Sequence, residues 1–379
     1  MTGPLAGLRV LEIGHMLAGP YCGLLLADLG AEVIKIEPPT GDIGREASAD
    51  FIGPHNAYFA SLNRNKRGVV INLAGAEGQA QLHELVRTSD ALLTNLRPSA
   101  IRKLGLTYED LKAINPKLVC VALTGFGLSS PYAERPAYDY VIQAMTGVME
   151  LTGDPGAGPT KTGYSAVDNS TGTFAALGLL AKIYSGTGGQ IDIAMYDVML
   201  SQLNYLASSS LNANTKATRL ANSAHPYFVP AQVFQTRDSW LVVFISHDRF
   251  WQIFAKELDK PEWLSDPDFA TLAARSRNRE KVVGEVAAAL RGHDTQEWMA
   301  RLVPLGIVVA GVSTLDQALA NEQTAARSMV VTIPTEDGPI KLTGNPIKIV
   351  GASEEFLAPP LLGQDNDWLL GVPVRHDAA

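Results

Sequence analysis

The chain of 379 residues has only two cysteines, Cys22 and Cys120, and both lie in apolar runs. A disulfide framework is therefore not expected, and a reducing compartment such as the cytoplasm is the natural location. The sequence has no run of about 18 apolar residues, so no membrane span is predicted. None of the histidines pairs with another histidine or a cysteine at the spacing of zinc ligands, so no metal site is predicted.

Positive charge is also scarce, because 31 lysines and arginines face 39 aspartates and glutamates, a net charge of −8. A general nucleic-acid binder usually shows a basic footprint, so that class is disfavoured. A phosphate-bearing ligand remains compatible if basic residues cluster locally. The 46% of hydrophobic and 18% of charged residues are typical of a globular protein, and the length suits two domains.

The first 195 residues alternate between apolar strands and helices. The run 9–13 predicts a strand, Pro20 to about Leu29 a helix, and 31–37 a parallel strand, which together form a βαβ unit. Further strands are expected at 69–73, 91–96, 118–123 and 190–195, and helices at 75–88, 99–105 and 107–114. This pattern predicts an α/β fold with a Rossmann-like parallel sheet, whose ligands bind beyond the carboxyl ends of the strands.

The pattern becomes mixed after about residue 195. Helices are expected at 196–213, 248–258, 268–290 and 295–303, a hairpin at 233–235 and 240–245, and strands at 329–333, 340–342 and 347–350. Asp294 and Glu297 have the spacing of a capping box. The expected organisation is a large domain over 1–195, a linker helix over 196–224, a small α+β domain over 225–315, a linker over 316–335, and a return to the large domain over 336–379.

The loop 163–172 consists of small and polar residues and leads into an apolar helix that should begin close to Asp168. In a structural interpretation, Asp168 or Ser170 is the N-cap of this helix. In a functional interpretation, Asp168 is a carboxylate nucleophile, because a helix N-terminus favours its charge and small neighbours leave it accessible. With an ordinary pKa of about 3.9, it would be ionised without a partner base.

A nicotinamide-binding site is a weaker alternative for the first βαβ unit. The turn 14–19 lacks the glycine pattern G-x-G-x-x-G, so a pyrophosphate could not approach its backbone closely. Glu37 at the end of the second strand imitates the acid that binds a ribose, but one acidic residue after a strand is common.

Four stretches in this order resemble the family III CoA-transferases of the CaiB/BaiF type, and the resemblance covers nearly the whole chain. They are Arg9–Asp42, Asn63–Arg67, the segments Asn95–Pro98, Leu104–Gly105 and Thr124–Gly127, and the run from Tyr138 to Gly172. The resemblance implies an interlocked homodimer in which long linkers join a small domain to the large one. It also implies that CoA and acyl-CoA are substrates, that small carboxylic acids are the partners, and that no cofactor is tightly bound.

In this family an aspartate at the position of Asp168 attacks the thioester of a donor acyl-CoA. The resemblance therefore implies a mixed anhydride, then an aspartyl-CoA thioester, and finally transfer of CoA to the acceptor acid. Such a site must exclude water, which would hydrolyse the anhydride. Backbone N–H groups at the helix start are candidates for stabilising the oxyanions.

The CoA phosphates require local positive charge. The candidate cations are Arg64, Lys66, Arg67, Arg97, Arg102 and Lys103. By resemblance, His15, Asn95, Leu96 and Lys103 match positions that line the CoA site, and Leu17 stands where the formyl-CoA:oxalate enzymes have Gln. Arg45 and His225 are candidates for contacting a distal substrate carboxylate.

Two alternatives to transfer remain within CoA chemistry. One is an α-methylacyl-CoA racemase or epimerase, which would need a second acid/base. The racemases have a histidine where this chain has Tyr138, and a phenol with a pKa of about 10 is a poor proton shuttle. The other is a CoA-binding protein without chemistry. The departures at Leu17 and Pro38 from the formyl-CoA:oxalate pattern argue against oxalate as acceptor. The chain as a whole resembles more closely the shorter members of the family, which act on dicarboxylates such as succinate, mesaconate, citramalate or glutarate.

Overall fold

The computed structural model describes residues 3–371, which its contacts group into two units. The first unit consists of the residues up to Gly147, Thr162–Thr215 and the residues from Glu322 on, and the second consists of Val148–Lys161 and Lys216–Asn321. The expected linkers 196–224 and 316–335 are thus divided between the units. Residues 372–379 of the predicted C-terminal part lie outside the described residues.

The first unit contains a six-stranded parallel sheet in the order β5-β2-β1-β6-β7-β8. Its strands are β1 (Arg9–Ile13), β2 (Glu32–Glu37), β5 (Lys66–Val70), β6 (Ala91–Thr94), β7 (Val119–Thr124) and β8 (Gly189–Ala194). Leu11 in the centre pairs with Ile34 on one side and Leu92 on the other. The central strands are buried, as their continuous apolar runs indicated. The predicted parallel α/β fold is confirmed, although β5 begins three residues earlier than expected.

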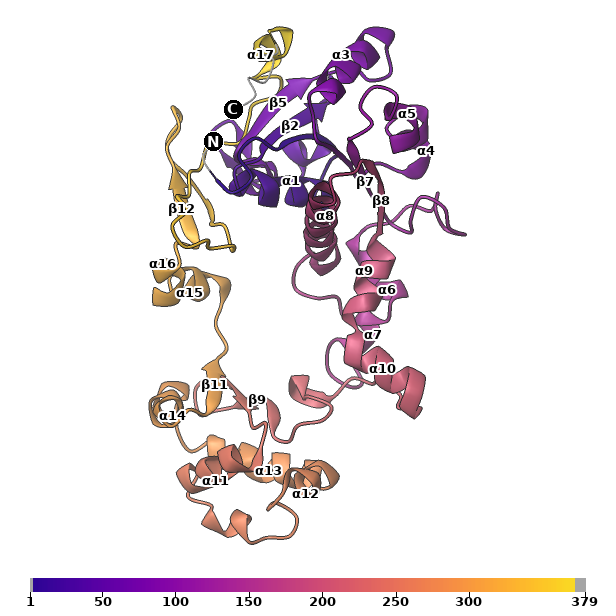
Figure 1. Cartoon of the computed structure of the whole chain (residues 1–379). Coiled ribbons are helices and arrows are strands. Elements are labelled where there is room, and N and C mark those ends of the chain that lie inside the picture. The colour runs from indigo at the N-terminus through magenta and orange to yellow at the C-terminus, as the bar shows by residue number, and fades with distance from the viewer. Residues whose placement is uncertain (1–2, 372–379) are drawn as a thin grey trace. The chain divides into compact units, whose positions relative to one another are not determined.

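Helices cover both faces of this sheet (Figure 1). Helices α1 (Ala18–Asp28) and α8 (Ala166–Tyr184) pack on the face that carries Val10, Val33 and Val121. The opposite face packs against α3 (Ala76–Arg87), α4 (Pro98–Lys103) and α5 (Tyr108–Leu111). The sheet therefore lies between two hydrophobic cores, and the loops at its carboxyl ends remain at the surface.

Helices α1 and α8 approach each other closely at Gly172. A Cβ atom on Gly172 would lie 2.7 Å from the carbonyl oxygen of Ala18 and 3.1 Å from the amide nitrogen of Cys22. Only glycine permits this packing without a shift of backbone. Because Gly172 lies one turn after Asp168, the contact holds the first turn of α8 beside the beginning of α1.

The C-terminal residues close the exposed edge of β5. The Asp365 carboxylate accepts the N–H of Gly68 at 2.8 Å, and Asn366 Oδ1 accepts the N–H of Val70 at 2.8 Å. Helix α17 (Asn366–Leu370) follows directly. These side chains satisfy edge donors that would otherwise be unpaired.

The remaining elements of the first unit are short. They are β3 (Phe51–Ile52), β4 (His55–Asn56), α2 (Ala57–Asn63), α6 (Asp139–Met145), α9 (Met195–Gln202), α10 (Asn204–Ala213), α16 (Glu322–Ala326), β12 (Val330–Ile333) and β13 (Ile340–Thr343). The predicted helix 196–213 is two helices that meet at Leu203. The strand predicted at 347–350 is wrong, because Asn345 Oδ1 accepts the N–H of Ile347 and forms a turn there.

The second unit is an α+β arrangement around a three-stranded antiparallel sheet in the order β11-β10-β9. Its elements are α7 (Val148–Leu151), β9 (Ala231–Gln235), β10 (Trp240–Phe244), α11 (Asp248–Glu257), α12 (Leu272–Arg277), α13 (Arg279–Leu290), α14 (Thr295–Leu302), β11 (Val308–Gly311) and α15 (Leu315–Leu319). The predicted hairpin is confirmed. The predicted helix 268–290 is interrupted at Asn278, and the capping box of α14 is present, with Glu297 accepting the N–H of Asp294.

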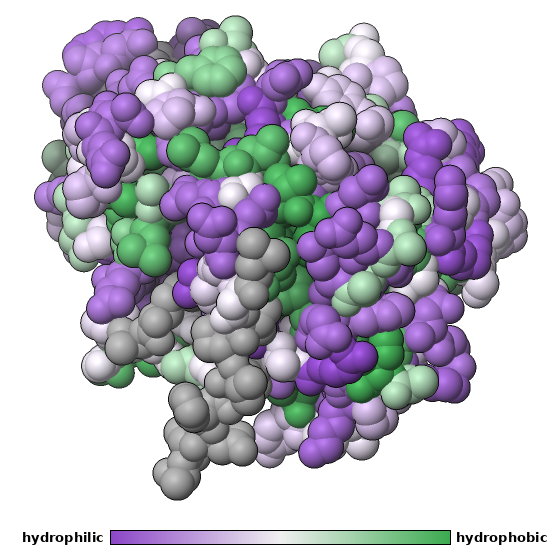
Figure 2. Space-filling model, turned by 90° about the horizontal axis from the view of Figure 1, so that it is seen from above, coloured by the Kyte–Doolittle hydropathy of each residue, from purple (hydrophilic) through white to green (hydrophobic). Residues whose placement is uncertain are grey.

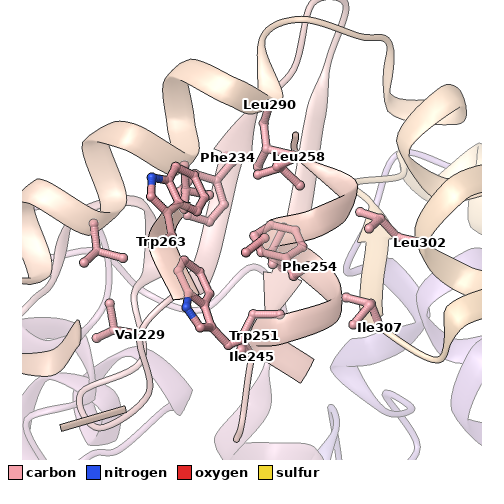
Figure 3. Packing of buried hydrophobic residues seen from close by; sticks show 14 of the residues in the cluster. Val229, Phe234, Ile245, Trp251, Phe254, Leu258, Trp263, Leu290, Leu302 and Ile307 are labelled. Atoms are coloured by element: carbon pink, nitrogen blue, oxygen red, sulfur yellow. The ribbon is translucent and has the colours of Figure 1, made fainter. Parts of the chain in front are cut away.

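Aromatic residues fill the core of this unit (Figure 3). The rings of Trp251 and Trp263 stack with centroids 5.4 Å apart. The buried guanidinium of Arg275 lies over Trp251 and bonds to the carbonyl oxygens of Val229 and Phe269 and to a nearby carboxylate. The second unit thus has a core of its own.

Hydrophilic residues cover most of the face seen from the end where α3 and α17 lie, with narrow apolar patches among them (Figure 2). No helix within residues 3–371 has the length and apolar composition needed to cross a membrane.

Candidate active site

Asp168 lies in the first turn of α8, which begins at Ala166. The expectation of a helix start near this residue is confirmed, but neither Asp168 nor Ser170 is the N-cap. That position belongs to Ser165, whose side chain makes no capping bond. Within residues 3–371 the Asp168 carboxylate accepts no hydrogen bond. Its oxygens therefore remain available to a substrate.

Asp139, in the first turn of α6, provides the capping interaction that Ser165 does not. Its Oδ2 accepts the N–H of Val167 at 2.8 Å, and its Oδ1 accepts the Nε2 group of Gln143 at 2.6 Å. Gln143 also donates to the hydroxyl of Thr162 at 3.0 Å and accepts the N–H of that residue at 3.0 Å. This buried network fixes both ends of the loop that leads to Asp168.

Burial, followed by the negative charge of Asp139, raises the pKa of the Asp168 carboxyl to about 7. The expectation of a fully ionised aspartate is therefore wrong, since about half of this carboxyl is protonated at pH 7. The same weak solvation makes the ionised form a stronger base and nucleophile than an exposed aspartate. Reactivity should accordingly rise with pH through the neutral range.

Tyr58, for which the sequence offered no motif, interacts electrostatically with Asp168. It lies on α2, where burial first, then the charges of Asp168 and Asp42, raise the pKa of its phenol to about 12. The phenol is therefore protonated at neutral pH and lies within electrostatic range of Asp168. A protonated hydroxyl in this position can donate to an oxygen that develops negative charge.

The structure brings together His15 and Asn95, which were both predicted to line the ligand site. They follow the neighbouring strands β1 and β6, and Asn95 accepts the N–H of His15 at 2.9 Å and donates to its carbonyl at 2.8 Å. A Cβ atom on Gly14 would collide with the Asn95 amide, so glycine is required there. The buried His15 Nδ1 has no hydrogen-bond partner within residues 3–371. An unpartnered buried nitrogen costs roughly 1–3 kcal/mol, which a bound ligand or water would relieve.

The candidate cations at the start of β5 have internal partners. Arg64 bonds to the carboxylate of Asp28 at 2.5 and 2.9 Å, and Lys66 pairs with Glu12 at 2.8 Å, all four side chains being buried. Arg67 is partly exposed and pairs with Glu32 and Asp365. These residues lie at the amino end of β5, and their internal partners engage the charges of Arg64 and Lys66 within the protein.

The candidate cations beyond β6 are exposed instead. Arg97 precedes α4, and Arg102 and Lys103 occupy its last turn. Arg102 pairs with the exposed carboxylate of Glu134. All three follow Asn95 and the half-buried Leu96 along the chain.

The guanidinium of Arg45 donates to both carboxylate oxygens of Glu37, at 2.8 and 2.6 Å. It lies over the ring of Phe59, with its central carbon 3.8 Å from the ring centre. It also donates to the carbonyl of Pro360, so in this conformation it offers little to a substrate carboxylate. His225 belongs to the second unit, where its Nδ1 accepts the N–H of Tyr227.

A family model described as CoA-transferase family III matches residues 5–366. The chain belongs to this family. It is 33% identical to the acetyl-CoA:oxalate CoA-transferase of Acetobacter aceti (94% of this chain, 92% of that protein). It is also 33% identical to the succinate–glutarate CoA-transferase of Agrobacterium fabrum (89% and 87%). A crystal structure of a CaiB/BaiF family protein from Brucella suis superposes with a TM-score of 0.86 at 31% identity, covering 98% of this chain and 99% of that one.

As a family III CoA-transferase, the protein is an enzyme whose substrates include CoA thioesters. The resemblance inferred from the four motifs is confirmed across the chain. No group of His, Cys, Asp and Glu side chains within residues 3–371 is arranged to hold a metal ion. The thiols of Cys22 and Cys120 are buried, and burial raises the pKa of both, so neither provides a thiolate at neutral pH.

Proposed function

We propose that this CoA-transferase moves CoA from a dicarboxylyl-CoA such as succinyl-CoA to a carboxylic acid acceptor, with Asp168 as the nucleophile. The observation that carries the assignment is the Asp168 carboxylate itself. It lies in the first turn of α8, accepts no hydrogen bond in the described chain, and is held in place through Asp139. The relatives named for oxalate and for succinate and glutarate support a dicarboxylate as substrate.

In the first half-reaction an oxygen of Asp168 attacks the thioester carbonyl, the C–S bond breaks, and CoA leaves as thiolate. The thiolate then attacks the aspartyl carbonyl of the mixed anhydride, so the donor acid leaves and an aspartyl-CoA thioester remains. The acceptor carboxylate repeats these steps in reverse and departs as the new acyl-CoA. No external base is consumed, provided that Asp168 enters the cycle ionised.

Most backbone N–H groups around Asp168 already have acceptors. The N–H groups of Ala166, Val167 and Asn169 bond to Tyr164, Asp139 and Ser165, respectively. These three donors are therefore poor candidates for an oxyanion hole, contrary to the expectation from the helix start. The protonated phenol of Tyr58 is the better candidate for stabilising the tetrahedral intermediates.

The acyl-CoA would bind across the loops that follow β1 and β6. His15, Leu17, Asn95 and Leu96 would line its path, and Arg97, Arg102 and Lys103 would face its phosphates. Tyr138, with 59% of its surface exposed directly before α6, would contact the acyl group.

We assign the active form as a homodimer because the first unit leaves large apolar side chains uncovered. Leu177 and Tyr184 on α8 are 64% and 96% exposed, Leu211 on α10 is 82% exposed, and α10 buries no residue. Large apolar side chains exposed to this extent are typical of interaction sites. Light scattering after gel filtration should give twice the chain mass of 40.5 kDa. A monomer that remains fully active would exclude the dimer.

The decisive experiment combines donor acyl-CoAs with carboxylic acids and identifies the product thioesters by mass spectrometry. Asp168→Ala should abolish exchange while its circular dichroism and unfolding midpoint stay near those of the wild type. Hydroxylamine or borohydride added during turnover should modify the peptide that contains Asp168. Exchange that persists in Asp168→Ala excludes the nucleophile assignment, and loss of an α-proton to solvent without carboxylate exchange indicates a racemase.

A further inference from the structure

Four charged side chains form a buried network beneath the loop that follows β1, and none of them takes part in the reaction described above. Lys35 bridges Glu12 at 3.0 Å and Asp42 at 2.8 Å, and Lys66 pairs with the other oxygen of Glu12 at 2.8 Å. All four side chains are almost completely inaccessible to solvent. We refer to them as the buried quartet.

The sequence makes room for this quartet. A Cβ atom on Gly23 of α1 would collide with the Glu12 carboxylate, so a larger residue there would displace the buried ion pair. Lys66 also donates to the carbonyl of Pro20 and to Asn63, each at 2.8 Å. A buried ion pair seldom contributes more stability than apolar residues of equal size would. Stability alone therefore does not explain the quartet, whereas holding one local backbone conformation would.

The network ends on the backbone of the loop 14–17. Lys35 donates to the carbonyl of Gly14 at 3.2 Å, and Asp42 Oδ1 accepts the N–H of Met16 at 3.1 Å. Met16 has φ of 60°, a left-handed conformation that side chains other than glycine disfavour. Together with Asn95, which binds both backbone groups of His15, the quartet fixes three consecutive residues of this loop.

We propose that Asp42, held by Lys35, is a positioning residue that keeps Met16 in its left-handed bend and so presents His15 and Leu17 to acyl-CoA. The inference rests on the proposed function, because it takes this loop as a CoA contact. Asp42 touches no reacting atom. Its loss therefore weakens acyl-CoA binding much more than it slows the chemistry at Asp168.

The test measures binding of CoA by calorimetry together with unfolding in urea. Asp42→Asn keeps an oxygen for Met16 but turns an NH₂ group toward the Lys35 ammonium, so the Kd for CoA should rise at least tenfold while kcat changes less than threefold. Asp28→Asn is the matched control, because Asp28 forms an equally buried ion pair with Arg64 away from the loop. It should lose stability but bind CoA like the wild type.

Two substitutions at Met16 address the bend directly, the first in the wild type with the quartet intact and the second in the Asp42→Asn background. Met16→Val, whose branched side chain tolerates positive φ poorly, should raise the Kd severalfold. Met16→Gly, which adopts that φ freely, should recover part of the affinity lost in Asp42→Asn. A merely structural role for Asp42 predicts no such recovery.

The outcomes separate the two proposals. If the wild type does not bind CoA, the proposed function fails and this inference fails with it. If the wild type binds CoA but Asp42→Asn and Met16→Val bind it equally well, only the positioning role is overturned. The same holds if Asp28→Asn loses as much affinity as Asp42→Asn. Should Asp42→Asn not fold, Met16→Val decides alone: a Kd for CoA equal to that of the wild type overturns the positioning role.

Discussion

Replacing Asp139 by Asn tests how the protein controls the ionisation of its nucleophile. Asp168 has its pKa raised from the ordinary 3.8 to about 7, first by burial and second by the charge of Asp139. Only the ionised form attacks a thioester, so kcat/KM should fall as the pH drops through about 7. Removing the charge of Asp139 stabilises ionised Asp168, which moves this acidic limb to lower pH.

The order of the two causes limits how far the Asp168 pKa can fall in Asp139→Asn. The Asp168 pKa lies about 3 above its ordinary value, and the charge of Asp139 accounts for the smaller share, so the midpoint should fall by about 1. At pH 6 the ionised fraction of Asp168 then rises from about one tenth to about one half, a gain of about fivefold in kcat/KM. At pH 8 both enzymes are almost fully ionised and should differ by less than about twofold.

The assay is the pH profile of kcat/KM for acyl-CoA, corrected for the folded fraction. The correction matters because an asparagine cannot accept from both Val167 and Gln143, which costs about 1–3 kcal/mol of stability. Asp192→Asn is a suitable control, since that carboxylate also accepts a backbone N–H, from Leu128 at 2.8 Å, but does not contribute to the Asp168 pKa. A limb that stays in place or moves to higher pH in Asp139→Asn refutes the reasoning.

Three further substitutions have defined expectations. Gly172→Ala should lower the free energy of unfolding in urea by about 1–3 kcal/mol, because its Cβ would press on the carbonyl of Ala18; an unchanged midpoint would contradict the packing. Arg275→Leu leaves three acceptors without their donor and should destabilise the second unit by about 2–4 kcal/mol; wild-type protection in hydrogen exchange there would argue against this. Tyr58→Phe should lower kcat by roughly 10²-fold with little change in KM, and full activity would exclude the phenol as oxyanion donor.

The sheet was predictable because each strand is a short apolar run between turn residues. One error concerned β5, because the strand expected at 69–73 left out its first residues, Lys66 and Arg67. Lys66 can enter the strand because Glu12 on another strand neutralises it inside the protein. Such compensation depends on tertiary contacts, and no local pattern reveals it.

The site was predictable in part for a similar reason. The loop and helix start marked Asp168 as a candidate, and the resemblance to the family III CoA-transferases gave it the role of nucleophile. The same resemblance matched His15 and Asn95 to the CoA site, and the structure places these two residues in contact. The raised pKa of Asp168 could not be foreseen, because it depends on burial and on Asp139, which the fold brings near it. Tyr58 lies still farther away in the sequence and carries no motif of its own.

The closing of the β5 edge by Asp365 and Asn366 has a consequence for synthesis on the ribosome. The edge strand is translated before the second unit, and the groups that satisfy its N–H donors are translated after that unit. The nascent chain must therefore carry an incomplete sheet while the whole second unit is being made. A chain truncated before Asp365 would lack both acceptors and would leave the N–H groups of Gly68 and Val70 unpaired at the edge.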